Sequence, residues 1–439
     1  MKTLAELFLE KFGVKYGDYV IIHQTDGSKL EGVLMPKHMF SHDETIILKL
    51  KSGYNIGIHV SKIDNIEKAD YIEESALQQV IRKSRTRRSN LPKVKILAVG
   101  GTILSKVDYR TGGVRSAVDP EELIDIIPEV LDIADIDTEI IMSKYSEHLT
   151  QEDWRIIAEK VSKAYREKWD GIVVLHGTDT LGYTSAALSF ALKGIGIPVI
   201  LIGSQRSSDR PSSDAAMNLL SALYLAGNFR YSGVFVSMHN SSSDDLVAVH
   251  LGTRVRKNHT SIRSAFQSID VPPIAYVRNF TEILYEDFLD ELILKERGED
   301  ALDFKPLFSK KVALIKFYPG MSPEIFKFFM NDYKAIIVEG TGLGHVSDRV
   351  IDTLKEVIRS GVYVFMTSQC IWGRVNLNVY DTGRELLRIG VIPLEDMLPE
   401  TAYVKACWVL GNYGEEALPE LMPVNIANEI IPRSFVRSR

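Results

Sequence analysis

The strongest constraint on the fold is a series of short apolar runs that alternate with stretches patterned as helices. Runs dominated by Val, Ile and Leu occupy residues 94–99, 140–142, 171–175, 198–202 and 233–237. A strand that is apolar at nearly every position must be buried on both faces, as in a parallel sheet covered by helices. The sequence therefore predicts an α/β domain built on a parallel sheet.

Signals for helix starts lie between these runs. Asp119 is followed by Pro120 and two glutamates, and Thr150 is followed by a polar, acidic turn that includes Asp153. A capping Asp or Thr, a proline at the first helical position and acids in the first turn all favour a helix N-terminus. We therefore expect helices to begin near residues 120 and 151.

The same alternation resumes after a polar stretch near residues 295–309, which we expect to be a hinge. Apolar runs follow at residues 312–317, 335–339 and 362–366. They predict a second, smaller α/β domain with its own parallel sheet.

Before residue 90 the pattern is that of short strands joined by tight turns. Candidate strands occupy residues 18–23, 30–35, 45–50 and 54–58, and glycines lie in the turns. This spacing predicts a small SH3-like β-barrel. Such modules serve many functions, so this one indicates no chemistry by itself.

A helix-like stretch near residues 71–81 leads into a dense basic run at residues 82–89. Two interpretations of this run are open: a solvated linker between domains, or a contact with nucleic-acid phosphates. The predicted organisation is a β-barrel module at 1–80, a basic linker at 81–92, a large α/β domain at 93–300 and a smaller one at 301–439.

Composition narrows the class of protein. The 439 residues exceed the size of one ordinary core, and the net charge of −6 argues against a surface built throughout for nucleic acid. Glu6 and Glu10 interrupt the N-terminal apolar residues, which argues against a signal peptide. Two cysteines, Cys370 and Cys407, cannot make a disulfide framework, and we expect both to be buried thiols in a cytoplasmic protein.

Polar groups follow the first and third of the predicted strands. The first runs into Gly-Gly-Thr102-Ile, and the third into His-Gly-Thr178-Asp179-Thr180. In a doubly wound sheet of order 2-1-3 these strands are neighbours, and ligands bind outside their carboxyl ends. We therefore expect Thr102 to face Thr178 and Asp179 across a crevice, although Thr180 is equally explained as a helix cap.

A threonine hydroxyl is a poor nucleophile until a base takes its proton. The basic segment Arg254-Val-Arg256-Lys257 offers a candidate, because a lysine beside a carboxylate can serve in proton transfer. Spacing alone does not choose Lys257 over its basic neighbours.

These motifs together resemble those of the asparaginase family. The likeness runs from residue 93 to the C-terminus, about four fifths of the chain. Further shared motifs are Gly-Ser-Gln-Arg at 203–206, Ser-Asp-Ala at 213–215, and Ser-Gln-Cys at 368–370 followed by Gly-Arg-Val at 373–375. The resemblance implies an asparaginase-like core of two α/β domains, here preceded by the barrel.

The resemblance also implies roles for individual residues. Thr102 matches the family's primary nucleophile, and Tyr109 matches a tyrosine in the loop that follows it. A second catalytic group is implied for Thr178, Asp179 and Lys257. No metal is implied.

Substrate contacts are implied for Ser146, Glu147 and His345. Glu147 stands where many members of the family have glutamine, which changes how a substrate amine would be recognised. His345 is either such a contact or a plain loop histidine.

A β-module and basic linker ahead of such a core resemble the glutaminase subunits of archaeal tRNA-dependent amidotransferases. This implies hydrolysis of glutamine through a threonine acyl-enzyme, with ammonia passed to a partner protein, the E subunit. The partner would use ATP and Mg to convert Glu-tRNA(Gln) to Gln-tRNA(Gln), with no cofactor in the glutaminase itself. A homodimer core and a 2+2 heterotetramer are also implied. The alternatives are a free-standing L-asparaginase with an added module and a catalytically silent scaffold.

Overall fold

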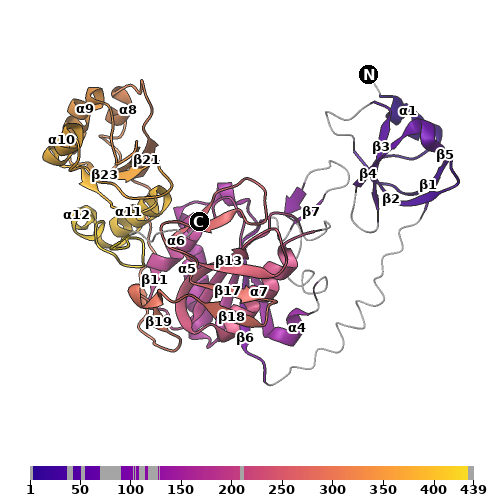
Figure 1. Ribbon diagram of the computed structural model, residues 1–439, viewed down its shortest axis with the longest axis horizontal. Coiled ribbons are helices and arrows are strands. Elements are labelled where there is room, and N and C mark those ends of the chain that lie inside the picture. Colours follow the sequence, from indigo (N-terminus) through magenta and orange to yellow (C-terminus); the bar gives the residue numbers. More distant parts are fainter. Residues whose placement is uncertain are drawn as a thin grey trace.

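The computed structural model describes residues 3–36, 43–50, 55–69, 90–101, 103, 105–107, 114–116, 127, 129–207 and 212–433. Figure 1 shows three folded units along the chain. The helices predicted near residues 71–81 and 120, and the basic run at 82–89, lie outside the described residues.

The N-terminal unit is a five-stranded antiparallel sheet with a helix beside it. Its elements are α1 (Leu4–Lys11), β1 (Tyr19–Gln24), β2 (Lys29–Met35), β3 (Thr45–Leu50), β4 (Asn55–His59), η1 (Val60–Lys62) and β5 (Ile63–Lys68). The strand order is β4-β3-β2-β1-β5, and the buried side chains of Val20, Ile22, Leu34 and Leu48 form the centre of its core. The predicted small β module is confirmed. The fifth strand escaped prediction because only Ile63 and Ile66 in it are buried.

The large domain is built on one twisted, mixed sheet. Its strands are β6 (Lys93–Ala98), β9 (Asp135–Ile140), β10 (Gly171–Leu175), β12 (Pro198–Ile202), β13 (Tyr231–His239), β14 (Leu246–Leu251), β17 (Ala275–Arg278) and β18 (Glu282–Tyr285). The order is β18-β17-β14-β13-β12-β10-β6-β9. The first strand therefore lies between the second and the third, which confirms the predicted 2-1-3 order.

Two features of this sheet differ from the prediction. The second strand, β9, spans residues 135–140 rather than 140–142. It is an edge strand with three acidic residues and no fully buried position, so it lacks the apolar run by which the other strands were predicted. Beyond β13 the sheet continues with antiparallel strands, β14, β17 and β18.

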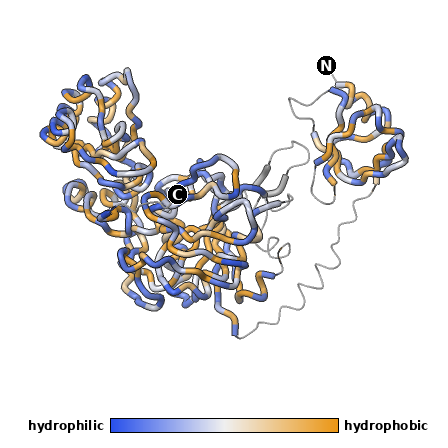
Figure 2. Tube along the Cα trace, in the orientation of Figure 1, coloured by the Kyte–Doolittle hydropathy of each residue, from blue (hydrophilic) through white to orange (hydrophobic). Residues whose placement is uncertain are grey.

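Helices cover both faces of the sheet, and alternate strand residues point to opposite cores. In β10, Ile172 and Val174 join a core with α5 (Gln151–Arg166) and α6 (Leu181–Ala191). Val173 and Leu175 join the core on the other face with α7 (Ala215–Asn228). This explains why the strand is apolar at every position. Figure 2 shows hydrophobic and hydrophilic residues interspersed along the chain of this domain.

The helix predicted after Thr150 is confirmed. The Thr150 side chain and Asp153 form a capping box at the start of α5.

Short elements complete the large domain. They are β7 (Ser105–Val107) paired with β8 (Val114–Ser116), α4 (Val130–Ile133), η3 (Ser146–His148), β11 (Leu192–Lys193) paired with β20 (Asp303–Phe304), β15 (Val255–Lys257) paired with β16 (Phe266–Ser268), η4 (Leu289–Glu291), and β19 (Lys295–Glu296) paired with β13. The stretch near 295–309, expected to be a hinge, is thus fixed to the large domain by β19 and β20.

The smaller domain has the predicted parallel sheet, in the order β21-β22-β23-β24. Its elements are β21 (Val312–Lys316), α8 (Glu324–Lys327), β22 (Ala335–Gly340), α9 (Asp348–Arg359), β23 (Tyr363–Ser368), α10 (Asp381–Ile389), β24 (Ile392–Pro393), α11 (Pro399–Tyr413), η5 (Glu415–Ala417) and α12 (Leu418–Leu421). Helix α11 packs between this sheet and α6 of the large domain, where Trp408 stacks on Phe190. The exact domain boundaries stay a prediction.

Two smaller observations complete the fold. Both cysteines are free, and Cys407 is buried as expected, whereas Cys370 is exposed. Within the described part of the chain, no helix is long and apolar enough to cross a membrane.

Candidate active site

The turns that follow β6 and β10 lie against each other. A Cβ added to Gly101 would lie 2.5 Å from Gly177 Cα, so only glycine permits this approach. Gly101 also has a φ of +94°, which L side chains rarely adopt. Thr102 and Tyr109 lie outside the described residues, but both chain neighbours of Thr102 are described, and Ile103 is fully buried. The two strand ends therefore meet, as the predicted strand order required.

Lys257 joins the polar residues at the end of β10. Its Nζ donates to Thr178 Oγ1 at 2.8 Å and to Asp179 Oδ1 at 2.7 Å. Thr178 is buried, and the Lys257 side chain is only 13% exposed. A hydroxyl, an amine and a carboxylate in this arrangement can move a proton to or from the hydroxyl, once the amine has lost its own. The structure thus brings together three of the sequence-predicted residues.

The structure also shows why Lys257 rather than a neighbouring arginine occupies this position. Successive residues of a strand point to opposite sides. Arg256 points to the smaller domain, where its Nε lies 3.2 Å from Glu400 Oε1. Arg254, just before β15, forms a fully buried ion pair with Asp396. Val255 packs into the large-domain core, and Lys257 points to that same side.

Ser146 lies beside the two touching turns. A Cβ on Gly177 would lie 2.7 Å from Ser146 Cβ, and the hydroxyl of Thr180 donates to Ser146 O at 2.7 Å. Thr180 thus holds the Ser146 segment instead of capping α6 with its side chain. Ser146 is buried and Glu147 is exposed. The pair therefore stands at the edge of the site, with Ser146 as the inner residue.

His345 lies in the smaller domain, where the structure gives it only local neighbours. Its ring packs edge-on against Tyr380 with centroids 5.2 Å apart, and its Nδ1 lies 3.4 Å from Thr382 Oγ1. Among the residues that the structure describes, His345 is not brought to Lys257 or Thr178. Its predicted role in substrate contact stays a prediction.

The loop after β12 supports the site, a role that the sequence reasoning did not assign. A Cβ on Gly203 would lie 2.7 Å from Thr178 Cγ2, so this loop packs directly against the threonine. The fully buried carboxylate of Asp214 accepts hydrogen bonds from the backbone N–H groups of Gln205 at 3.0 Å and Arg206 at 3.1 Å. The sequence feature that could have indicated this role of Asp214 is the Ser-Asp-Ala motif immediately before α7, because an aspartate at such a position can cap a helix or a loop.

His176 precedes the turn that carries Thr178 and Asp179, but it is not poised to act as a base. Its Nδ1 donates to Gly177 O at 2.7 Å, and the ring is fully buried. Burial disfavours the charged ring and lowers the pKa of His176 to about 4. The neutral ring therefore serves as a rigid support for the turn. No group of His, Cys, Asp and Glu side chains that could hold a metal occurs in the described ranges.

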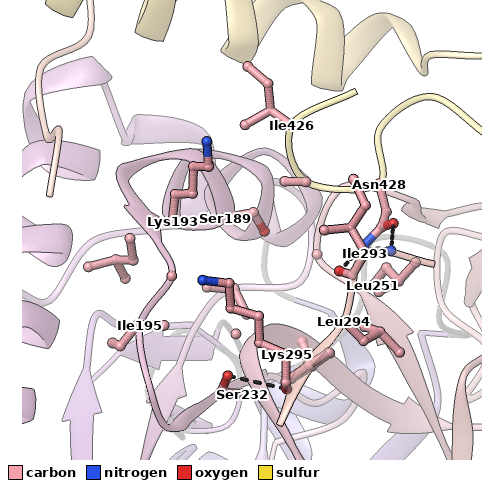
Figure 3. A pocket seen from close by; sticks show the side chains of 17 residues that line it. Ser189, Lys193, Ile195, Ser232, Leu251, Ile293, Leu294, Lys295, Ile426 and Asn428 are labelled. Carbon is pink, nitrogen blue, oxygen red and sulfur yellow. Dashed lines mark hydrogen bonds between the residues drawn. The ribbon is translucent and has the colours of Figure 1, made fainter. Parts of the chain in front are cut away.

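A pocket of about 110 Å³ lies elsewhere, between the large domain and residues 426–428 near the C-terminus (Figure 3). Its lining includes Ser232 and Gly233 at the start of β13, together with Lys193, Lys295 and Asn428. The candidate catalytic residues Thr178 and Asp179 follow the carboxyl end of β10, whereas this pocket adjoins the beginning of β13. It is therefore not part of the candidate active site.

Comparison of the sequence with known families gives three matches. Residues 93–288 match the family described as Asparaginase, N-terminal, and residues 311–422 match the Glutaminase/Asparaginase C-terminal domain. Residues 14–68 match the GatD N-terminal domain. The three matches follow the three folded units.

Curated relatives match over nearly the whole length. The D subunit of the glutamyl-tRNA(Gln) amidotransferase of Thermococcus kodakarensis is 45% identical over 439 residues, covering 98% of each chain. The protein of the same name from Pyrococcus furiosus is 47% identical over 434 residues, covering 97% of each chain.

Solved structures match the two α/β domains. The thermostable L-asparaginase from Thermococcus kodakarensis superposes with a TM-score of 0.69 at 34% identity, covering 78% of this chain and all of that one. L-asparaginase I from Vibrio cholerae superposes with a TM-score of 0.67 at 29% identity, covering 77% of this chain and 99% of that one.

Proposed function

The chain belongs to the asparaginase family, within its branch of glutamyl-tRNA(Gln) amidotransferase D subunits, and we propose that it hydrolyses glutamine to supply that reaction with ammonia. The observation that carries the proposal is the contact of Lys257 Nζ with both Thr178 Oγ1 and Asp179 Oδ1 at the carboxyl end of β10. A hydroxyl activated by a neighbouring amine and carboxylate can attack the carbonyl carbon of a side-chain amide.

The proposed chemistry proceeds through an ester on Thr102. The Thr102 hydroxyl oxygen attacks the side-chain amide carbon of glutamine, the C–N bond breaks, and ammonia leaves with the hydroxyl proton. Water then attacks the ester, glutamate leaves, and the threonine regains its proton. Backbone N–H groups near the two strand ends stabilise the negative charge on the carbonyl oxygen in each step.

Thr178, Lys257 and Asp179 manage protons in this scheme. The Lys257 amine accepts a proton from a hydroxyl or from water and returns it to the leaving group, while Asp179 keeps the amine oriented. The buried position of Thr178 and the low exposure of Lys257 support this role, because a proton relay works best where bulk water does not compete. Tyr109, Ser146, Glu147 and His345 are proposed to contact the substrate or close the site.

The partners are part of the proposal. A D subunit is one component of a multi-subunit enzyme. The E subunit is proposed to receive the ammonia and to use ATP and Mg to amidate Glu-tRNA(Gln) in the cytoplasm, while this chain needs no cofactor. A homodimer of this chain with two E subunits is the proposed assembly.

Ammonia release tests the proposal. We expect the assembled enzyme to release ammonia from glutamine in the presence of Glu-tRNA(Gln), ATP and the E subunit, with equimolar Gln-tRNA(Gln) formed. The control is the same assay with asparagine in place of glutamine. Vigorous hydrolysis of asparagine by this chain alone, with no stimulation by the partner, would contradict the amidotransferase role.

A free-standing L-asparaginase with an added N-terminal module is the second candidate. The likeness of the two α/β domains to solved L-asparaginases favours it. The full-length likeness to D subunits, including residues 14–68, favours the first candidate. The asparagine control distinguishes the two.

A further inference from the structure

Arg263 lies in the loop of the hairpin that carries Lys257. The hairpin consists of β15, which ends at Lys257, and β16, which begins at Phe266. The guanidinium of Arg263 donates to Asp244 Oδ1 at 2.6 Å, to Ser242 O at 3.2 Å and to Ser212 O at 2.6 Å. One side chain thus fastens the hairpin to the loop after β13 and to the loop before α7.

A chain of hydrogen bonds continues from Asp244 towards Thr178. Asp244 Oδ1 lies 3.1 Å from His239 Nε2, and His239 Nδ1 lies 2.8 Å from Asn218 Oδ1. Asn218 Nδ2 donates to Gly203 O at 3.0 Å. Gly203 is the residue whose added Cβ would lie 2.7 Å from Thr178 Cγ2, so the chain ends at the threonine.

The directions of these hydrogen bonds are fixed by the groups themselves. Asn218 Nδ2 faces acceptors on Gly203 and Asp214, so Oδ1 is the atom that faces His239. His239 Nδ1 therefore donates to Asn218 Oδ1, while Nε2 lies against the Asp244 carboxylate. The His239 ring is fully buried between these two partners.

We infer that Arg263 is a positioning residue that sets Lys257 against Thr178, with Asp244 and His239 as its link to the threonine. Lys257 lies on the hairpin that Arg263 fastens, and Thr178 lies against the loop at the other end of the hydrogen-bonded chain. The two partners of the 2.8 Å contact are therefore held from both sides through one guanidinium. The kinetic consequences of this inference rest on the proposed amide hydrolysis.

The first test is kinetic. In Arg263→Met, we expect kcat for glutamine hydrolysis by the assembled enzyme to fall about 10- to 100-fold, because small misplacements of a catalytic group cost this much. KM should change less than about 3-fold, since no substrate contact is removed. Guanidinium ion at a non-denaturing concentration should restore part of kcat. Arg278→Met is the matched control, because Arg278 is an exposed arginine whose pair with Glu282 lies within the β17–β18 hairpin.

The second test reads Lys257 without using activity. Competitive acetylation of lysines, followed by peptide mass spectrometry, should label Lys257 slowly in the wild-type chain and at least about 3-fold faster in Arg263→Met, as its shielding contacts loosen. Lys163, 65% exposed on α5, provides the internal reference. Asp244→Asn is a second variant with nearly unchanged shape at an exposed position, and it should shift both readouts in the same direction.

The outcomes separate the two proposals. Wild-type kcat and wild-type Lys257 labelling in Asp244→Asn, or in a folded Arg263→Met, would overturn the positioning role. If Arg263→Met does not fold, Asp244→Asn decides alone. If the wild-type enzyme released no ammonia from glutamine but Lys257 labelling still rose in the variants, the proposed function would fail while the positioning role stood.

Discussion

Lys257 Nζ donates to Thr178 Oγ1 at 2.8 Å, across a distance of 79 residues in the sequence. The contact joins a strand end of the parallel sheet to a separate two-stranded hairpin. It needs both elements in place, so the contact on which the proposed proton relay depends forms only in the assembled large domain.

Replacing Lys257 tests the relay directly. Lys257→Met removes the amine but keeps much of the side-chain volume, and we expect kcat for amide hydrolysis to fall about 10²- to 10⁴-fold. In Lys257→Arg, kcat should fall nearly as far, because a guanidinium does not give up its proton. Ammonia release is the measurement, and circular dichroism checks the fold. Lys163→Met is the control. Near-normal activity of Lys257→Arg would contradict a role in proton transfer, because it would show that a positive charge is sufficient at this position.

The ion pair of Arg254 with Asp396 should be a major link between the domains. Both side chains are fully buried, so Arg254→Met leaves the Asp396 carboxylate with the more distant Arg374, whose Nη2 lies 3.8 Å from Oδ2, in place of its close partner. We expect this to destabilise the protein by up to about 3–5 kcal/mol. The double variant Arg254→Met/Asp396→Leu should recover much of this loss. In thermal unfolding, we expect the stability to decrease from wild type to the double variant to the single variant. Arg256→Met is the control, because its pair with Glu400 is partly exposed; equal losses in both single variants would contradict the argument.

The sequence predicted much of this site because its logic is topological. The apolar runs at β6 and β10 and the 2-1-3 order were enough to place Thr178 and Asp179 beside the end of the first strand. The role of Lys257 was not predictable from spacing, since Arg254 and Arg256 have the same charge. The choice depends on which carboxylates the smaller domain presents, namely Asp396 and Glu400, and these are distant in sequence.

The edge of the sheet was harder to predict for a related reason. Neither face of β9 is apolar along its whole length. Its charged residues pair with residues that are distant in sequence, as Glu139 does with Lys160. The antiparallel strands β14, β17 and β18 lack helices between them, so the helix–strand alternation that identified the other strands was absent. Pairing with neighbouring strands of the sheet, rather than a local sequence pattern, determines where these strands form.

Acid should destabilise the large domain through His176. Its pKa is lowered to about 4 in the folded state from an ordinary 6.5, so between these pH values the unfolded chain binds more protons. The free energy of unfolding should therefore be unaffected by His176 above pH 6.5 and should fall by roughly 3 kcal/mol as the pH drops from 6.5 towards 4. Unfolding followed across this range should show a shallower loss in His176→Gln. Exposed His148 provides the control, and an identical pH slope in His176→Gln and wild type would refute the assignment.

Thr102 is the residue on which the acyl-enzyme proposal depends. Thr102→Val keeps the shape of the side chain but removes the hydroxyl, so we expect glutamine-dependent formation of Gln-tRNA(Gln) to be abolished. Added ammonia should still support amidation, because the partner's chemistry is untouched. Both rates are measured with the complete enzyme. Glutamine-dependent amidation that survived in Thr102→Val would move the nucleophile elsewhere, with Thr178 as the next candidate.

The touching turns at Gly101 and Gly177 should differ in their tolerance of a methyl group. Gly101→Ala places Cβ 2.5 Å from the backbone of Gly177 at a φ of +94°, and backbone cannot move aside cheaply. We expect a loss of at least about 1–2 kcal/mol from the conformation alone, with the turn displaced and activity lost. Gly177→Ala instead meets the side chain of Ser146 at 2.7 Å, so Ser146→Gly should relieve it. Thermal unfolding of the Gly177→Ala/Ser146→Gly double variant should therefore return towards that of Ser146→Gly alone, whereas Ser146→Gly should not rescue Gly101→Ala. Rescue of both glycine variants by Ser146→Gly would mean that the two turns are not in backbone contact.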